Sequence, residues 1–567
     1  MILYRQQEAG AWSNTARKRR LFNQPTTHSP RRRILILRGE FLSIQFLHTT
    51  PRWHPHASKA WRRGITIAAL ALGTLVFVVQ IVLSHAGPIL KGRVIETLRA
   101  RFDSEVQLDN LQVSIAHGLQ VTGSGLRIFP EDDQRTPENN LPIVAIQHFE
   151  FRASPVGLFF KPTHVRQVDV RGLAINVPPT SRRSQASPHK RRDKIKIRVD
   201  KIVCDDSKLV IGTDKPDKDP RVFQLRHIVL RDLGPGTAWP FDAVLTNPIP
   251  KGEIHATGSF GPWNTDNPGN SELSGKYLFE NADMNTIKGI GGILKSSGLF
   301  DGRLDRIAVR GEADVPDFSL DTANRPMPLS TRFQAVVDGT SGDTYLEHID
   351  AKLGSSYFTC KGAVVDVRGK GHKIDVDTDV PNGQIADFLG LAVKTNPTPM
   401  SGVLNLQAKL QIPPGGESVS QKMTMHGAFT LRQIHFTNPA IEDKVDLMSL
   451  RARGHTSNLK PGAPDVTSKM MGNFQMQNGQ LAFSRLDYTL PGGDVHLTGH
   501  YTMDGRRYEF KGKVRTKAEV SEMVASKWKR ILLKPIDPFF SKHGWGTEVP
   551  IKISSDKNGK PKFGFSL

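Results

Sequence analysis

The sequence lacks the motifs on which most enzyme sites are built. It contains no Gly-x-x-x-x-Gly-Lys-Ser/Thr phosphate loop, no His-Glu-x-x-His zinc motif and no Gly-x-Ser-x-Gly nucleophile turn. The 19 histidines stand at no ligand spacing. We therefore expect a protein that is not an enzyme, with no catalytic, metal or cofactor-binding residues.

Cysteine is equally scarce. Cys204 and Cys360 are far apart in the chain and match no metal-binding or redox spacing. A disulfide between them would require an oxidising compartment, and two buried thiols are the alternative that we favour.

The nearest approach to a metal-binding string is Asp375, Asp377 and Asp379. An EF-hand would need Gly and Glu where this sequence has Val380 and Ala386, so these carboxylates are expected on the solvent face of a strand.

Only one long uncharged apolar run is present, at residues 65–83. As a helix rising about 1.5 Å per residue, it would cross the roughly 30 Å of a bilayer's hydrocarbon core. We predict a transmembrane anchor here, represented by Ile65, Leu70, Leu75, Val79 and Leu83. A cleaved signal peptide is the alternative, because Ser84-His85-Ala86 resembles a cleavage site, although the apolar run is longer than signal peptides usually have.

Positive charge is concentrated ahead of this run. Residues 1–64 hold 13 Lys and Arg against 2 acidic residues, a net charge of +11 out of +22 for the whole chain. By the positive-inside rule, this basic and largely disordered segment stays in the cytoplasm and residues 84–567 lie across the membrane. The remainder is only mildly basic, so the high isoelectric point is not a nucleic-acid signature, and no nucleic-acid partner is expected.

After the apolar run the pattern becomes that of a mainly β protein. Residues 89–102 have the spacing of a short amphipathic helix, and then the hydrophobic period changes from 3.6 to 2. Short alternating runs separated by Gly, Pro, Asn and Asp turns fill most of the remaining chain. Glycines inside these runs, such as Gly258 and Gly275, suggest β-bulges. Further short helices are expected at 283–294 and 518–533, and the Ser-, Pro- and Arg-rich residues 178–194 form a linker or loop.

An alternating sheet has one apolar face, which must be covered. Two packed sheets would cover it, and so would closure into a barrel. A third solution is a curved sheet whose apolar groove holds acyl chains, and periodicity alone leaves all three open. If a groove exists, we expect it to be lined by alternating apolar residues that otherwise would be ordinary core: Val168, Val170, Phe223, Leu225, Phe333, Leu404, Leu406, Phe483 and Leu497.

Several stretches, taken in order, resemble the AsmA family. In the first half these are residues 93–130 and 149–177, with Ser154-Pro155-Val156-Gly157-Leu158. The second half is more similar to the AsmA-like C-terminal region, at residues 258–263, 287–292, 314–318, 337–340, 534–540 and 549–553. The resemblance covers residues 65–567 and implies relatedness to TamB-like and bridge-like lipid-transfer proteins. It implies a bacterial inner-membrane protein with a periplasmic body formed by a long, curved, groove-shaped antiparallel β-sheet with a few short helices.

The resulting division of the chain is a cytoplasmic segment at 1–64, a transmembrane helix at 65–83, an AsmA-like N-terminal periplasmic β region at 84–177, a basic linker at 178–194 and an AsmA-like C-terminal groove region at 195–567. The function expected from the resemblance is phospholipid movement to the outer membrane, or maintenance of its lipid balance. The expected partners are phospholipid acyl chains, the inner membrane and outer-membrane components. The alternative is a non-catalytic envelope scaffold that influences outer-membrane protein assembly.

Overall fold

The structure is a computed structural model. It describes residues 70–74, 77, 91–92, 95–96, 99, 105–114, 119–129, 141–153, 163–177, 179, 197–213, 215–233, 237–262, 264, 268–454, 466–502, 507–519, 522, 534, 546–555 and 561–565. Residues 1–74 and 75–567 form two separate units. The description that follows concerns the second unit, apart from the start of the predicted anchor.

The predicted anchor lies mostly outside the described residues. Leu70 to Thr74 and Phe77 are helical, and Leu70 is 69% exposed, whereas Ile65, Leu75, Val79 and Leu83 are not described. Among the residues that the structure describes, no helix is both long enough and apolar enough to span a membrane. The predicted helices at 89–102 and 518–533 also lie largely outside the described part, although the described residues between 91 and 99 are helical.

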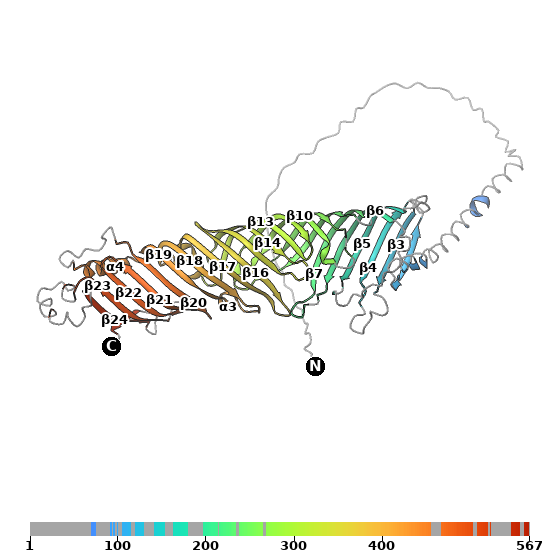
Figure 1. Cartoon of the computed structure of the whole chain (residues 1–567). Helices are drawn as coiled ribbons and strands as arrows, with labels where there is room; N and C mark the ends of the chain where they lie inside the picture. Colours follow the sequence, from blue (N-terminus) through green and yellow to red (C-terminus); the bar gives the residue numbers. More distant parts are fainter. Residues whose placement is uncertain are drawn as a thin grey trace, which may run out of the picture. The chain divides into compact units, whose positions relative to one another are not determined.

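Strands dominate the described part of the chain, as the hydrophobic period predicts: 67% of the described residues are in strands, and they form one large, curved half-barrel sheet (Figure 1). Their bounds are β1 Val106–Gln107, β2 Asn110–Ser114, β3 Leu119–Ile128, β4 Val144–Ala153, β5 Thr163–Val177, β6 Ile197–Ile211, β7 Arg221–Leu233, β8 Trp239–Pro248, β9 Lys251–Phe260, β10 Glu272–Asp283, β11 Ile290–Gly291, β12 Ile293–Arg303, β13 Arg306–Leu320, β14 Met327–Val337, β15 Thr344–Leu353, β16 Ser356–Val367, β17 Gly371–Gln384, β18 Met400–Ile412, β19 Thr424–Phe436, β20 Lys469–Gln477, β21 Gln480–Leu490, β22 Gly493–Thr502, β23 Tyr508–Thr516, β24 Thr547–Ser555 and β25 Pro561–Phe565.

The described helices are short. They are η3 (Pro268–Asn270), η4 (Met284–Thr286), α2 (Ile385–Ala392), α3 (Val419–Lys422) and α4 (Pro439–Ala452). Helix α4 was not predicted from the sequence, although its start has two features typical of a helix N-terminus. Pro439 stands in the first turn, and the Asn438 side chain accepts a hydrogen bond from the Ala440 amide.

The helix predicted at 283–294 is wrong. This stretch finishes β10, makes the single 3₁₀ turn η4 and then enters β11 and β12. Gly289 and Gly292 have φ values of +96° and +123°, which no right-handed helix can contain. The glycines that weakened the helix signal here are therefore the residues that break the chain into turn and strand.

Most strands pair with their neighbours in the chain; the short strands β1 and β11 pair with β3 and β13, so that β10 pairs with β12. All described pairings but one are antiparallel. The exception is the parallel pair β5–β6, whose register runs from Thr163 opposite Ile197 to Val177 opposite Ile211. The predicted linker lies in the connection between these two strands. The predicted β regions 84–177 and 195–567 are consequently joined in one sheet by this ladder.

Gly258 and Gly275 do not form the predicted bulges. They are opposite one another in β9 and β10, and the register passes through both without a shift. A Cβ atom added to Gly275 would lie 2.3 Å from the Thr257 carbonyl oxygen and 2.7 Å from the Phe300 ring. Glycine is needed here because an aromatic ring from the neighbouring strand lies over the backbone.

Candidate functional site

One face of the sheet is predominantly apolar, and we call it the apolar face. Paired residues in a sheet lie on the same side, so the register can be followed from strand to strand. A file of directly paired residues crosses the sheet from β2 to β24, and none of its members is charged: Leu111, Gly123, Phe149, Val170, Cys204, Ile228, Ala243, Ala256, Tyr277, Gly298, Gly311, Phe333, Ile349, Cys360, Thr378, Ala408, Gly427, Phe474, Phe483, Gly499, Phe510 and Ile553.

All nine predicted lining residues lie on this face. Val170, Phe333 and Phe483 belong to the file itself. The other six pair with apolar-face residues in adjacent rows: Val168 with Ile202, Phe223 with Leu209, Leu225 with Leu245, Leu404 with Leu431, Leu406 with Phe429 and Leu497 with Leu486. The strands thus bring residues more than 300 positions apart onto one surface. That this surface holds acyl chains stays a prediction.

The side chains of the apolar face are only partly buried by one another. Val170 and Leu404 are buried, whereas the other seven predicted lining residues are half-buried. Buried clusters occur around Val121 and Val170, around Ala243 and Ala256, and around Leu404 and Leu431. Among the described helices, α2 contributes Ile385 and Phe388 to the last of these clusters. No second sheet is present in the described part, because all of its strands belong to one sheet.

Several other aromatic residues on this face were not predicted from the sequence, among them Phe429, Phe474 and Phe510. Phe429 packs against Phe474 and Phe483, and Phe483 packs against Phe510, with ring centroids 6.0 to 6.3 Å apart. Tyr277 and Phe300 lie over the glycines of β10 to β13. Their positions follow the same two-residue period as the named residues, so extending that period along each strand would have found them.

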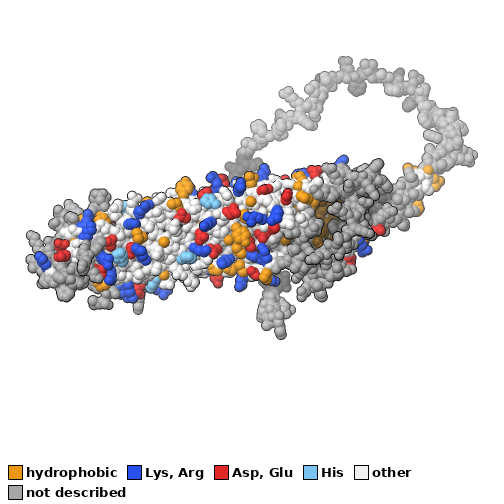
Figure 2. Space-filling view, in the orientation of Figure 1, with side chains coloured by type: hydrophobic (Ala, Val, Ile, Leu, Met, Phe, Trp, Pro, Cys, Tyr) orange, Lys and Arg blue, Asp and Glu red, His pale blue; other side chains and the backbone are white. Residues whose placement is uncertain are grey.

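The opposite face is polar. Lys, Arg, Asp and Glu side chains are interspersed over the visible surface (Figure 2). Many form exposed ion pairs between neighbouring strands, such as Arg332 with Glu312 and Lys295 with Glu280. Such pairs contribute little to stability, typically about 0–1 kcal/mol each, but they keep this face soluble.

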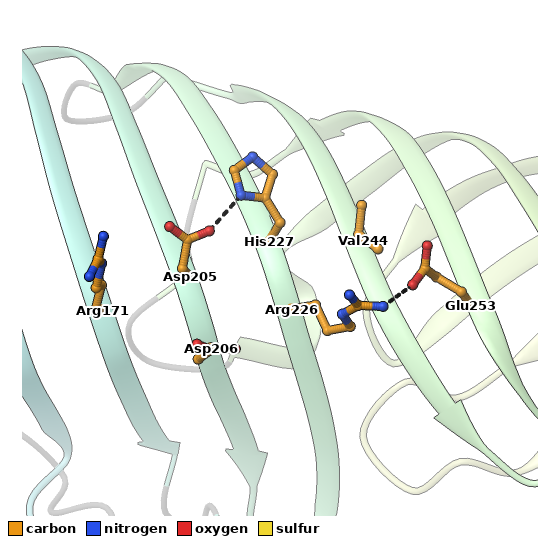
Figure 3. A pocket seen from close by; sticks show the side chains of 7 residues that line it. All are labelled: Arg171, Asp205, Asp206, Arg226, His227, Val244 and Glu253. Carbon is orange, nitrogen blue, oxygen red and sulfur yellow. Dashed lines mark hydrogen bonds and ion pairs between the residues drawn. The ribbon is translucent and has the colours of Figure 1, made fainter. Parts of the chain in front are cut away.

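A shallow polar pocket lies on this polar face (Figure 3). Its rim includes His227, whose Nδ1 is 2.7 Å from Asp205 Oδ1, and Arg226, which pairs with Glu253. All four side chains are at least one third exposed and already partnered within the protein. We therefore do not assign this pocket a ligand.

The three aspartates that resembled a metal-binding string are also on the polar face. Lys409 Nζ lies 3.0 Å from Asp375 Oδ1 and 4.0 Å from Asp377 Oδ1. The Lys409 hydrogen bond is the main reason that the pKa of Asp375 is below its ordinary value. Within the described residues, no group of three or more His, Cys, Asp and Glu has the geometry of a metal site.

Both cysteines face the apolar side and are free thiols. Cys204 is 2% exposed, and burial, with a smaller contribution from the Asp205 charge, raises its pKa to about 12. Burial also raises the pKa of Cys360, although a contact with the Thr378 hydroxyl opposes the shift. High pKa values make both thiols poor nucleophiles at neutral pH.

No family model, curated protein or solved structure matches this chain.

Proposed function

We propose that this protein binds phospholipid acyl chains along its apolar face and transfers lipid between the inner and outer membranes of a bacterial envelope, without catalysis. The observation that carries the proposal is the file of uncharged residues from Leu111 to Ile553, on a face that has no second sheet over it in the described part. Half-buried apolar side chains on such a face favour an apolar guest, by about 25 cal/mol per Å² removed from water.

This face suits an acyl chain because it offers a large apolar contact area and few groups that could form directional hydrogen bonds with a guest. Its rows consist mostly of aliphatic, aromatic and glycine residues, and some of the polar side chains among them are hydrogen-bonded within the protein. Ser296, for example, donates to the Glu312 carbonyl oxygen at 2.8 Å and lies 3.1 Å from the Tyr277 hydroxyl. The charged headgroup of the phospholipid would be excluded from the row of uncharged side chains and would remain near solvent.

The location is part of the same proposal. Residues 65–83 would anchor the chain in the inner membrane, with the N-terminus in the cytoplasm and the half-barrel in the periplasm. The half-barrel would then receive lipid at the inner membrane and deliver it toward outer-membrane components. An envelope scaffold that carries no lipid is the competing function, and the two differ in whether the apolar face is occupied.

A photo-crosslinking pair tests occupancy in the full-length chain. Benzoylphenylalanine replaces Phe333 on the apolar face or, as the matched control, Gln334, which is next in β14 and on the polar face. After irradiation of cells and denaturing purification, we expect phospholipid adducts by mass spectrometry at position 333, at least about tenfold above position 334. Equal or absent adducts at both positions would overturn lipid binding and favour the scaffold.

A further inference from the structure

The two long edges of the half-barrel are in contact. In an antiparallel sheet of consecutive strands, successive connections alternate between the edges. The β6–β7, β8–β9, β10–β12 and β13–β14 connections lie at one edge, here the first edge. The β12–β13, β14–β15, β16–β17 and β18–β19 connections lie at the other, the second edge. Contacts between members of these two sets therefore cross the apolar face.

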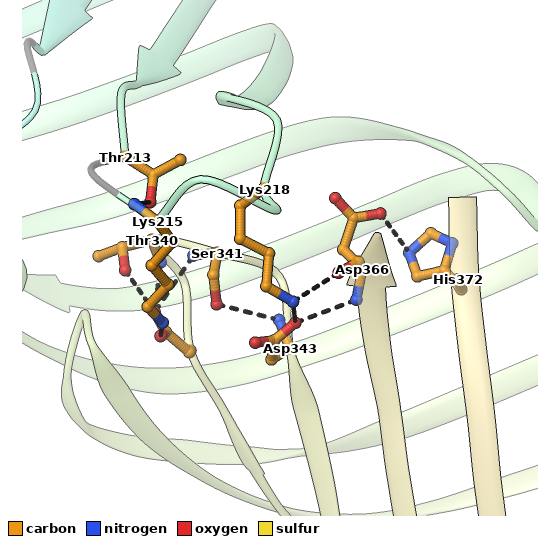
Figure 4. A network of polar contacts seen from close by, with 9 residues as sticks. Thr213, Lys215, Lys218, Thr340, Ser341, Asp343, Asp366 and His372 are labelled. Atoms are coloured by element: carbon orange, nitrogen blue, oxygen red, sulfur yellow. Dashed lines mark hydrogen bonds and ion pairs between the residues drawn. The ribbon is translucent and has the colours of Figure 1, made fainter. Parts of the chain in front are cut away.

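The β6–β7 connection makes the most extensive of these contacts (Figure 4). Lys218 Nζ donates to Asp343 Oδ1 at 2.6 Å and to the Asp366 carbonyl oxygen at 2.5 Å. The Lys218 and Asp343 side chains are only 8% and 6% exposed. The same Asp343 oxygen accepts a hydrogen bond from the Asp366 amide at 3.0 Å. One buried ion pair thus joins the first edge to two hairpins of the second.

Backbone contacts extend this junction. The Arg368 amide donates to the Asp217 carbonyl oxygen at 2.7 Å, and the Gly369 amide donates to Asp219 Oδ2 at 2.7 Å. Beneath them, Ile211 of β6 is buried with Leu304 and Ile307 of the second edge. The junction therefore has an apolar layer, a buried charge pair and backbone hydrogen bonds.

A second junction lies farther along the same two edges. Ser418, just before α3 in the β18–β19 connection, donates to Asp321 Oδ2 at 2.5 Å, and the Val419 amide donates to the Lys288 carbonyl oxygen at 2.9 Å. Lys288 and Asp321 belong to the first edge. A Cβ atom on Gly289 would lie 2.4 Å from Ser418 Oγ, so glycine permits this close approach. In both junctions, a connection at the first edge contacts a connection at the second edge that comes several strands later in the chain.

We propose that these two junctions form a seam that closes the half-barrel from the side between β6 and β19, so that a guest enters lengthwise from an end and not between the edges. The statement about the guest rests on the proposed function, whereas the seam rests on the contacts alone. The buried Lys218–Asp343 pair fixes which hairpins meet, because any other alignment would leave a buried charge unpaired.

Alkylation of Cys360 measures whether the seam is closed. Cys360 lies on the apolar face in β16, away from the junction residues. Lys218→Ala leaves Asp343 buried and unpaired, so we expect local opening and about tenfold faster alkylation by a charged maleimide. Lys295→Ala, which removes the exposed ion pair with Glu280, is the matched control and should leave the rate unchanged.

A double variant separates an open seam from general unfolding. Lys218→Met with Asp343→Asn removes both charges but keeps a side-chain oxygen that can accept from the Asp366 amide, and it should restore the wild-type alkylation rate. Wild-type rates in Lys218→Ala, or equally fast alkylation in Lys295→Ala, would overturn the seam. Failure of the double variant to slow the reaction would equally count against it.

Lateral entry is tested by locking the junction. In Asp217→Cys with Arg368→Cys, a short bifunctional maleimide should bridge the two edges, and loss of bridging in the native protein would contradict the seam. Loading of a fluorescent phospholipid from vesicles should change less than about twofold on bridging. A tenfold loss would show that lipid enters between the edges. If neither form takes up lipid, the proposed function fails, and the Cys360 rates alone decide the seam.

Discussion

At the scale of single residues, the apolar face combines glycines with large aromatic side chains. Gly298 and Gly311 are paired across β12 and β13, and a Cβ atom on either would lie within 3 Å of the Tyr277 side chain. A strongly curved sheet crowds its inner side, so a ring on one strand occupies the space that a neighbouring Cβ would need. These two glycines were not singled out in the sequence, and only the cross-strand register explains them.

The two thiols provide a residue-scale prediction. With a pKa of about 12, Cys204 is about 10⁻⁴ thiolate at pH 8, against about 0.2 for an ordinary thiol, so its alkylation should be roughly a thousandfold slower. Cys360, which is less buried, should react faster than Cys204. Timed iodoacetamide reactions followed by peptide mass spectrometry measure both rates, and both should become ordinary in denaturant. Equal native rates would show that the two environments do not differ as described.

At the scale of elements, the strands could be predicted because each depends on a local two-residue period. The predicted lining residues Phe223, Phe333 and Leu404 fall within β7, β14 and β18. The connections could not be predicted in the same way, because their contacts are non-local. Lys218 meets Asp343 across 125 positions, and nothing beside Lys218 in the sequence indicates its partner.

Asp338 provides a prediction for these connecting elements. Burial alone would raise its pKa, but hydrogen bonds from Thr340, Ser341 and Lys215 outweigh burial and lower the pKa below its ordinary value. Because the folded pKa is below the unfolded one, the stabilisation is complete above about pH 4 and disappears as the pH falls through the folded value.

Asp338→Asn should therefore reduce the free energy of unfolding by about 1–2 kcal/mol at pH 7, with the difference shrinking toward zero in acid. Urea unfolding followed by circular dichroism across this pH range measures it. Asp350→Asn is the control, because Asp350 pairs with His348 on the exposed polar face and should cost less than about 0.5 kcal/mol. A difference that is the same at pH 7 and in acid would contradict the assigned pKa.

At the scale of the whole molecule, the sequence predicted a curved, mainly antiparallel sheet but not how its parts are joined. Residues 178–194 were expected to be a basic linker or loop between two β regions. The structure pairs β5 and β6, on either side of it, in a parallel ladder. A parallel pair requires its connection to return from one end of the strands to the other, and composition alone does not distinguish such a crossover from an interdomain linker.

This ladder predicts the behaviour of a chain cut in two. With a specific protease site inserted within residues 178–194, cleavage should give two fragments that still co-elute on a native sizing column. Backbone hydrogen bonds along β5 and β6 and the buried cluster that includes Val170 and Cys204 hold them together. The same fragments should separate in denaturant, and the uncleaved protein with the inserted site controls for the insertion. Two independent domains joined by a linker would instead separate under native conditions, because no ladder would connect them.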